Sequence, residues 1–451
     1  MFRPISRLAA ILAATLLVIQ PVAAQSILRD AETEALLRDM AAPLIAAAGL
    51  DPRNVDVVLI NDSSVNAFVA GGQAVYINSG LINAAGSANE VQGVIAHELG
   101  HVVGGHVISD GGGKAATGIS LLSLLLGAAV AAAGGGEAAM GVLMAGQQAA
   151  MGKYLAFSRA QESSADAAGA QYLSKAGVSG RGSIAFFKKL ENMAYRAGYS
   201  PSDDDAFYST HPMTGDRIAR LQDTYGSDPA WLKPSDPALE ARFQRARAKL
   251  YGYLAEPRET LTVYPETMNG APARYARAYA WHKHADMGKA IAEADALLAA
   301  QPDDPYFLEL KGQILLESGK PAEALGALRR ATELSGNQPL IATLLGHALI
   351  ATEEQANFVE AERVLKTAVA RDRDNPFAWY QLGVVYAANG DLPRARLASA
   401  EQQVLSGRMP EALQSAEAAE RALPKGSPDW LRAQDIALQA RAAIERQRDR
   451  K

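Results

Sequence analysis

The stretch IAHELGHVVGGH, from Ile95 to His106, decides how the N-terminal half of this chain folds. It holds one glutamate and three of the seven histidines in the 451-residue sequence. Ser87 and Glu90, three residues apart just before it, form a capping box, which predicts that a helix begins near residue 88. Apolar residues recur with helical spacing from 91 to 102, so we expect that helix to run through the quoted stretch.

The spacing of the first two histidines indicates a metal site. His97 and His101 lie one helical turn apart on the same face, with about 6 Å between their Cβ atoms, so both imidazoles can reach one ion. Glu98 adjoins the first histidine, where it can accept the proton of an attacking water. The H-E-x-x-H pattern on a helix is specific, and its usual metal is zinc. A histidine-rich solvated helix is the alternative that the capping box and the apolar neighbours disfavour.

A hydrolytic zinc site generally has three protein ligands and an open position for water. The metzincin pattern would need a third histidine at position 107, which is Val107, whereas the extra histidine is His106. A carboxylate is available instead in AFSRAQESSADAAGAQYLSKAG, residues 156–177. We expect Glu162 to bind zinc and Asp166, one turn later, to orient a ligand imidazole. The alternative is that both acids lie on a solvated helix face.

The N-terminal residues 1–24 are typical of a secretory signal peptide. Arg3 and Arg7 precede an apolar run, and the small residues Val22 and Ala24 precede the predicted cleavage site. An uncleaved anchor is the alternative, but the run is shorter than the roughly 20 residues that span a bilayer. We therefore expect a secreted protein, located in a bacterial periplasm.

The composition removes several classes of function. The sequence has no cysteine, which excludes disulfides, cysteine catalysis and thiolate metal sites, so any metal must use histidine, aspartate or glutamate. The formal net charge is −5, and no basic stripe with interleaved aromatic residues is present. Nucleic acid is therefore not an expected partner.

Proline and glycine positions divide the chain into regions. Strand signals such as VDVVLI from Val55 mix with helical ones over residues 25–225, which predicts an α+β domain. Prolines recur over residues 226–270 around one charged helix, and we interpret this segment as a linker. Residues 271–451 are helical and repetitive, so a second, all-α domain is predicted there.

The repeat has a measurable period. Prolines at 305, 339 and 376 are each followed seven residues later by glycines at 312, 346 and 383, which gives periods of 34 and 37. This pattern resembles the tetratricopeptide repeat, in which glycine lies where paired helices approach closely, and four to five units are expected. An alanine-rich helical bundle would not need the matched spacing. Stacked helix pairs form a concave groove suited to peptides or protein surfaces.

An uncharged run of 22 residues, 115–136, lies between the predicted zinc ligands. It is long enough to span a bilayer, but one crossing would place the histidines and Glu162 on opposite sides of the membrane. We therefore interpret residues 115–152 as an apolar lid that covers the cleft or dips into a membrane surface, with glycine clusters as hinges.

Three motifs together resemble one peptidase family. HELGH with His106 five residues on, RAQESSAD at 159–166 and STHPMTGDRI from Ser209 are similar to the gluzincin family of the CAAX prenyl proteases and the heat-shock membrane protease. With the signal peptide and the repeats, the chain resembles the periplasmic branch of that family. The resemblance implies a zincin-like α+β metalloprotease domain followed by an all-α tetratricopeptide-repeat solenoid. It also implies that NAFVAGGQAVYINSGLI, from Asn66, contains an edge strand that pairs with extended substrate.

The resemblance assigns roles to particular side chains. His97, His101 and Glu162 would bind one zinc ion, and Glu98 would be the general base. His211 would either donate to the oxyanion or occupy the open zinc position and keep the enzyme latent, and Arg217 would pair with an acid such as Asp166. The implied catalytic residues are thus Glu98, His211 and Asp166.

The implied function is that of a periplasmic zinc endopeptidase which degrades misassembled outer-membrane β-barrel proteins. Its repeats would recruit substrate or the assembly machinery, and the lid would supply a peripheral membrane contact. The alternative is a chaperone-like assembly scaffold whose protease site is mostly latent. The intact HELGH and Glu162 favour the enzyme, because a scaffold has no physical need of them.

Overall fold

The computed structural model describes residues 26–70, 72–106, 144, 159–196, 211 and 215–448. The predicted signal peptide lies outside these residues, and so does the predicted lid apart from Met144. The chain divides into two compact units. Unit 1 comprises the residues up to Leu28 and Arg38–Ser235, and unit 2 comprises Arg29–Leu37 and Asp236–Lys451.

Unit 1 is built on a small mixed sheet. Its strand order is β1-β2-β4-β3, with β2 parallel to β4 and the two outer strands antiparallel to their neighbours. The strand predicted from Val55 corresponds to β2, and the stretch from Asn66 contains β4 and the edge strand β3. The strands are β1 (Ser26–Ile27), β2 (Asp56–Asn61), β3 (Ala67–Ala70) and β4 (Ala74–Asn78).

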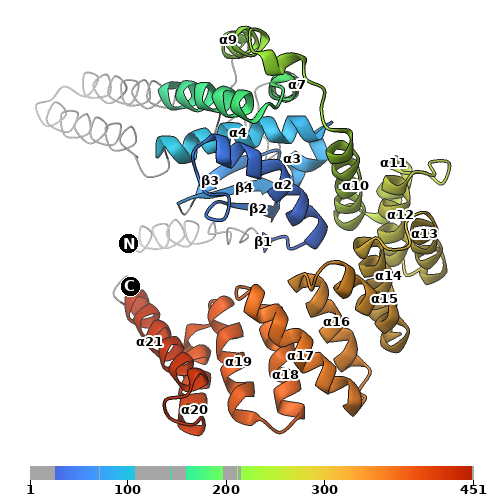
Figure 1. The fold of residues 1–451 in the computed structure, drawn as a ribbon, viewed down its shortest axis with the longest axis vertical. Coiled ribbons are helices and arrows are strands. Elements are labelled where there is room, and N and C mark those ends of the chain that lie inside the picture. The colour runs from blue at the N-terminus through green and yellow to red at the C-terminus, as the bar shows by residue number, and fades with distance from the viewer. Residues whose placement is uncertain are drawn as a thin grey trace, which may run out of the picture. The chain divides into compact units, whose positions relative to one another are not determined.

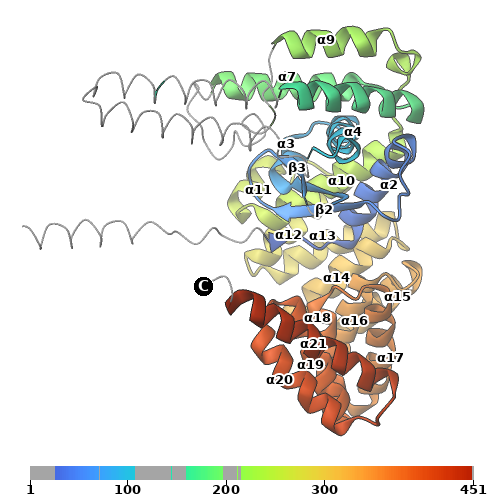
Figure 2. The same ribbon diagram turned by 90° about the vertical axis from the view of Figure 1, so that its left-hand side faces the viewer.

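The H-E-x-x-H helix, α4 (Ala88–Gly104), is the central helix of unit 1. Its predicted N-terminus is confirmed, because Ser87 accepts a hydrogen bond from the Glu90 N–H and the Glu90 carboxylate accepts one from the Gly86 N–H. Figure 1 and Figure 2 show α4 between the sheet and α7, and it packs against β3, β4 and α7. The other helices of unit 1 are α3 (Ser79–Ala84), α7 (Arg181–Arg196), α9 (Gly215–Gly226), the short η2 (Pro229–Leu232) and a helix at 159–176. Helix α2 (Ala31–Ala47) contributes to both units.

Unit 2 consists of helical pairs, as Figure 1 shows, and the predicted fold class is confirmed. A Cβ added to Gly312 would lie 2.4 Å from Leu328, and one added to Gly346 would lie 2.6 Å from Leu365, so glycine permits the close approach of paired helices there. The pairs are α12 (Ala271–Lys283) with α13 (Met287–Ala300), α14 (Pro305–Glu317) with α15 (Pro321–Leu334), α16 (Pro339–Ala351) with α17 (Gln355–Arg371), α18 (Pro376–Ala388) with α19 (Leu392–Leu405), and α20 (Met409–Ala422) with α21 (Pro428–Arg448).

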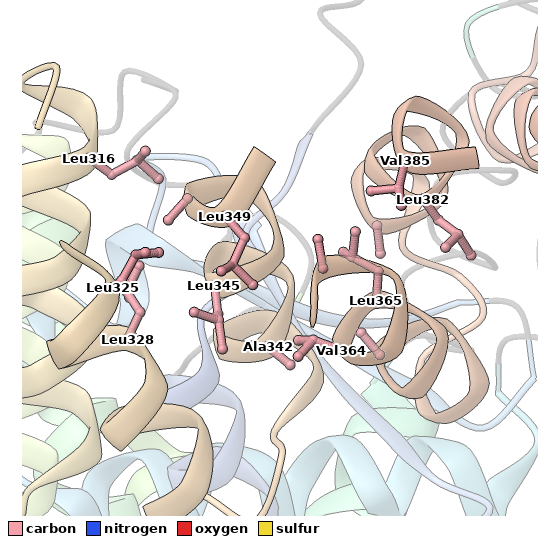
Figure 3. Packing of buried hydrophobic residues seen from close by; sticks show 14 of the residues in the cluster. Leu316, Leu325, Leu328, Ala342, Leu345, Leu349, Val364, Leu365, Leu382 and Val385 are labelled. Carbon is pink, nitrogen blue, oxygen red and sulfur yellow. The ribbon is translucent and has the colours of Figure 1, made fainter. Parts of the chain in front are cut away.

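One apolar core continues through three consecutive helical pairs, from α14 to α19. Figure 3 shows Leu345 and Leu349 of α16 between Leu328 of α15 and Leu365 of α17. These four leucines are almost fully buried. Each repeat therefore completes its core only with its neighbours, which is the property that makes such solenoids cooperative along their length.

The segment predicted as a linker contains two helices of unit 2, α10 (Pro237–Leu254) and α11 (Pro257–Val263). Helix α10 packs against α12 and buries Phe243 and Ala246 almost completely. Helix α10 is the charged helix expected in this segment, and Pro237 and Pro257 stand at the first positions of α10 and α11, where proline is favoured. No helix in the described part of the chain has both the length and the apolarity needed to cross a bilayer.

A group of buried charges links the first residues of unit 2 to its helices. Lys249 of α10 pairs with Asp30, and its Nζ lies 3.6 Å from Glu32 and 4.0 Å from Glu309 of α14. Burial raises the pKa of the Glu309 carboxyl to about 7, although Lys249 opposes the shift. Since its pKa is raised on folding, Glu309 destabilises unit 2 increasingly as the pH rises from its unfolded pKa towards 7.

We therefore expect Glu309→Gln to be more stable than the parent at pH 8 by up to roughly 3 kcal/mol, because a neutral amide carries no such penalty. Below about pH 3.5 the difference should disappear, since the carboxyl is then mostly protonated in both the folded and the unfolded state. The free energy of unfolding in urea at several pH values measures this. The exposed Glu323→Gln is the control, and an advantage of Glu309→Gln that does not change with pH would contradict the assignment.

Candidate metal centre

Four buried side chains of unit 1 converge on one point. We call these residues the donor cluster: His97, His101, Glu162 and His211. One ligand atom from each of them lies within 4.8 Å of the other three. The Nε2 atoms of His97 and His101 are 3.1 Å apart. The carboxylate of Glu162 lies 3.4 Å from the first of these atoms and 3.3 Å from the second. His211 Nδ1 lies 3.3 Å from His97 Nε2 and 3.0 Å from Glu162 Oε1.

Two glycines allow the helices that carry the donors to approach closely. A Cβ added to Gly100 of α4 would lie 2.6 Å from the carbonyl oxygen of Ala165, and one added to Gly169 would lie 3.1 Å from the backbone of Ala96. The helix at 159–176 therefore rests directly on the backbone of α4. This contact places Glu162 beside histidines that are more than 60 residues away in the sequence.

Asp166 and Arg217 support the donor cluster from outside. Asp166 Oδ1 lies 3.0 Å from His97 Nδ1. Arg217 donates two hydrogen bonds to Asp166, at 2.5 and 2.7 Å, and its Nη1 lies 2.9 Å from Glu162 Oε2. The Arg217–Asp166 pair expected from the sequence is thus present, and the planar guanidinium fixes both carboxylates at once.

The electrostatics of the cluster favour a bound cation. Burial alone would lower the pKa of His97, but hydrogen bonds to Asp166 and Glu162 raise this pKa to about 9. Burial would likewise raise the pKa of Glu162, but His101, His211 and His97 hold it well below its usual range. The carboxylates therefore stay ionised and retain a positive charge at the cluster. Imidazole nitrogens around a carboxylate oxygen form a donor set that suits zinc, so the residues present fit this metal.

Glu98 lies next to the donor cluster without belonging to it. Its side chain is 1% exposed, and its Oε1 lies 3.5 Å from His211 Nε2. This oxygen has no hydrogen-bond partner among the described residues. A buried carboxylate oxygen without a partner is costly, and such groups in native structures commonly have a catalytic role.

The structure thus brings together every candidate residue that the sequence provided. His97, Glu98 and His101 come from α4, Glu162 and Asp166 from the helix at 159–176, and His211 from the segment before α9. Sequence reasoning assigned no role to His106, whose ring contacts His101. Its position five residues after His101, just beyond the glycine pair that ends the helix, was the available signal.

Two histidines of an H-E-x-x-H helix and a glutamate of a second helix, buried together beside a mixed sheet, are typical of a metallopeptidase. Residues 28–225 match the model of peptidase family M48, and residues 271–339 and 351–403 match that of the tetratricopeptide repeat. The chain is therefore a metallopeptidase with an N-terminal domain that matches peptidase family M48 and a C-terminal region that matches the tetratricopeptide repeat.

Several known proteins are similar to this chain. The beta-barrel assembly-enhancing protease of Escherichia coli (strain K12) is 27% identical over 380 residues, which cover 82% of this chain and 75% of the relative. Metalloprotease LoiP of the same strain is 32% identical over 180 residues, which cover 39% of this chain and 64% of that protein. The crystal structure of YrrB, a tetratricopeptide-repeat protein with an unusual peptide-binding site, matches 40% of this chain and 92% of its own at 21% identity, with a TM-score of only 0.32.

Proposed function

We propose that this protein is a zinc-dependent endopeptidase of the periplasm that degrades misassembled outer-membrane β-barrel proteins. In this proposal the repeats recruit the substrate or the assembly machinery. The observation that carries the proposal is the buried donor cluster with the carboxylate of Glu98 beside it, whose Oε1 has no hydrogen-bond partner among the described residues. The name of the relative that covers most of the chain supports the link to β-barrel assembly.

His97, His101 and Glu162 would hold the metal. A zinc ion bound there supplies a Lewis acid that polarises the scissile carbonyl and makes the attacking water more acidic. Glu98 accepts the proton of that water and later returns it to the leaving amine. Asp166 keeps His97 in place through this cycle, because the two side chains are in contact. Arg217 holds Glu162 in the same way.

The edge strand β3 supports an extended mode of substrate binding. Its only partner in the four-stranded sheet is β4, and α4 packs against it. An extended peptide that paired with β3 would gain main-chain hydrogen bonds whatever its sequence. This mode of binding suits an enzyme that acts on unfolded proteins of different sequences, because it recognises the main chain.

Metal analysis combined with cleavage of an unfolded β-barrel protein tests the proposal. The purified protein should hold about one zinc per chain and cleave the unfolded barrel more readily than the folded barrel. A chelator should abolish cleavage and added zinc should restore it. Protein that binds no zinc, or cleavage that persists after the metal has been removed, would refute the proposal.

The position of His211 favours a second function, that of an assembly scaffold whose protease site is mostly latent. His211 lies within the donor cluster, where it can fill the position that water needs. In an open state its imidazole would instead donate to the oxyanion of the substrate. These two roles predict opposite effects of removing the side chain.

If His211 mainly closes the site, we expect His211→Ala to raise the cleavage rate of short flexible peptides several-fold, with zinc still bound. Peptide cleavage by the zinc-loaded protein measures the effect, and His284→Ala in unit 2, which removes an exposed imidazole, is the control. A fall in the cleavage rate with zinc intact would make His211 part of the catalytic apparatus instead.

A further inference from the structure

The end of helix α4 folds back on the metal centre. Gly105, just after the helix, has a φ of 62°, in the left-handed region that glycine adopts without strain. Its N–H donates to the carbonyl of Val102, and the N–H of His106 donates to the carbonyl of His101. These two bonds form a Schellman motif, which satisfies the last carbonyls of the helix and reverses the chain.

This reversal brings the ring of His106 beside the ring of His101. Their Nδ1 atoms are 2.8 Å apart, and the ring planes are inclined by 74°. A Cβ added to Gly104 would lie 2.5 Å from His106 Nε2, so the ring of His106 packs against a position that has no side chain. The contact between the two rings therefore depends on the chain reversal at Gly105 and on the missing side chain at Gly104. A histidine exposed at the surface would need neither.

The contact offers Nδ1 of His101 a hydrogen-bond partner. His101 Nε2 faces the donor cluster, 3.1 Å from His97 Nε2 and 3.3 Å from Glu162 Oε1. If Nε2 binds a metal, the ring proton must be on Nδ1, and that N–H needs an acceptor. Ligand histidines usually donate this hydrogen to a carboxylate or a carbonyl, and Asp166 is placed to accept it from His97. His106 Nδ1 is the corresponding acceptor for His101.

We infer that His106 is a positioning residue that accepts a hydrogen bond from His101 Nδ1 and thereby holds His101 Nε2 ready for the metal. The inference rests on the proposed zinc site but assigns it a further residue. It also makes the centre asymmetric. His97 is supported by a buried carboxylate that is itself held by Arg217, whereas His101 is supported by a partly exposed imidazole. His101 is therefore the ligand whose support is more easily lost.

Two substitutions separate positioning from simple packing. In His106→Asn, the amide oxygen can take the place of Nδ1 and still accept the hydrogen bond, whereas His106→Leu fills similar space without an acceptor. We expect the leucine variant to release zinc about 10-fold to 100-fold faster than the parent when a chelator is added. The asparagine variant should stay within a few-fold of the parent. Thermal unfolding of the metal-free proteins shows whether both variants still fold.

Zinc release is followed with a chromogenic chelator on the full chain, and His284→Leu is the control. Equal release rates for the leucine variant and the parent would overturn the inference while leaving the zinc site intact. So would an asparagine variant that releases zinc as fast as the leucine variant, because restoring the acceptor would then have no effect. A parent protein that binds no zinc would instead refute the proposed function itself, and the inference with it.

Discussion

Glu98→Gln should lower peptide cleavage by about 100-fold to 10,000-fold and leave the zinc content of the protein unchanged. The first effect is expected because the amide cannot accept a proton from water. The second follows from geometry, because Glu98 lies beside the donor cluster and supplies none of its four ligand atoms. The substitution preserves the shape of the side chain, so the buried site should keep its packing. Turnover of an unfolded β-barrel protein and the zinc content of the same sample measure both effects.

The exposed Glu191→Gln, on α7 of the same unit, controls for the loss of one negative charge. A Glu98→Gln protein that cleaved at the parent rate would exclude this residue as the general base. Loss of zinc together with activity would mean that Glu98 contributes to metal binding, which its place outside the donor cluster argues against.

The same variant separates the enzyme from the scaffold. Because the repeats form their own core in unit 2, binding of partners should survive Glu98→Gln. Cells that carry this variant in place of the parent should accumulate damaged outer-membrane proteins, bound but uncut, if proteolysis is the main task. Cells that clear these proteins normally, while deletion of residues 271–451 is harmful, would favour the scaffold.

The part of the site that helical periodicity alone could predict is the part that depends on local geometry. The helical repeat alone fixes His97 and His101 on one face, with Glu98 beside the first of them. The capping box that starts the helix is also local, and it is present as expected. The glycines of the repeats indicated where paired helices approach, because they stand at the positions of the tetratricopeptide pattern that the sequence resembles.

The remaining contacts depend on packing between distant segments, which periodicity does not report. Glu162 reaches the histidines only because Gly100 and Gly169 let two helices approach closely. Without these contacts, its position on a helix is equally compatible with a solvated face. His106 was missed because its role depends on a chain reversal after the helix. Segment 226–270 was interpreted as a linker because proline marks helix starts as well as loops.

Glu162→Gln should strip most of the zinc from the protein. A neutral amide oxygen is a much weaker ligand than a carboxylate, and loss of a hydrogen bond outside the ligand shell already costs about 10-fold to 100-fold in affinity. We therefore expect zinc affinity to fall by at least about 100-fold, with cleavage falling in parallel. The substitution also removes the carboxylate that Arg217 Nη1 contacts at 2.9 Å, which loosens the support of the site.

Zinc content after dialysis and competition with a chelator measure this loss, with Glu191→Gln as the control. The donor cluster makes the opposite outcome informative, because it offers four ligands where a hydrolytic site uses three. Full retention of zinc in Glu162→Gln would reject Glu162 as the third ligand and leave His211 in that role. His211→Ala alone would then lose the zinc that Glu162→Gln keeps.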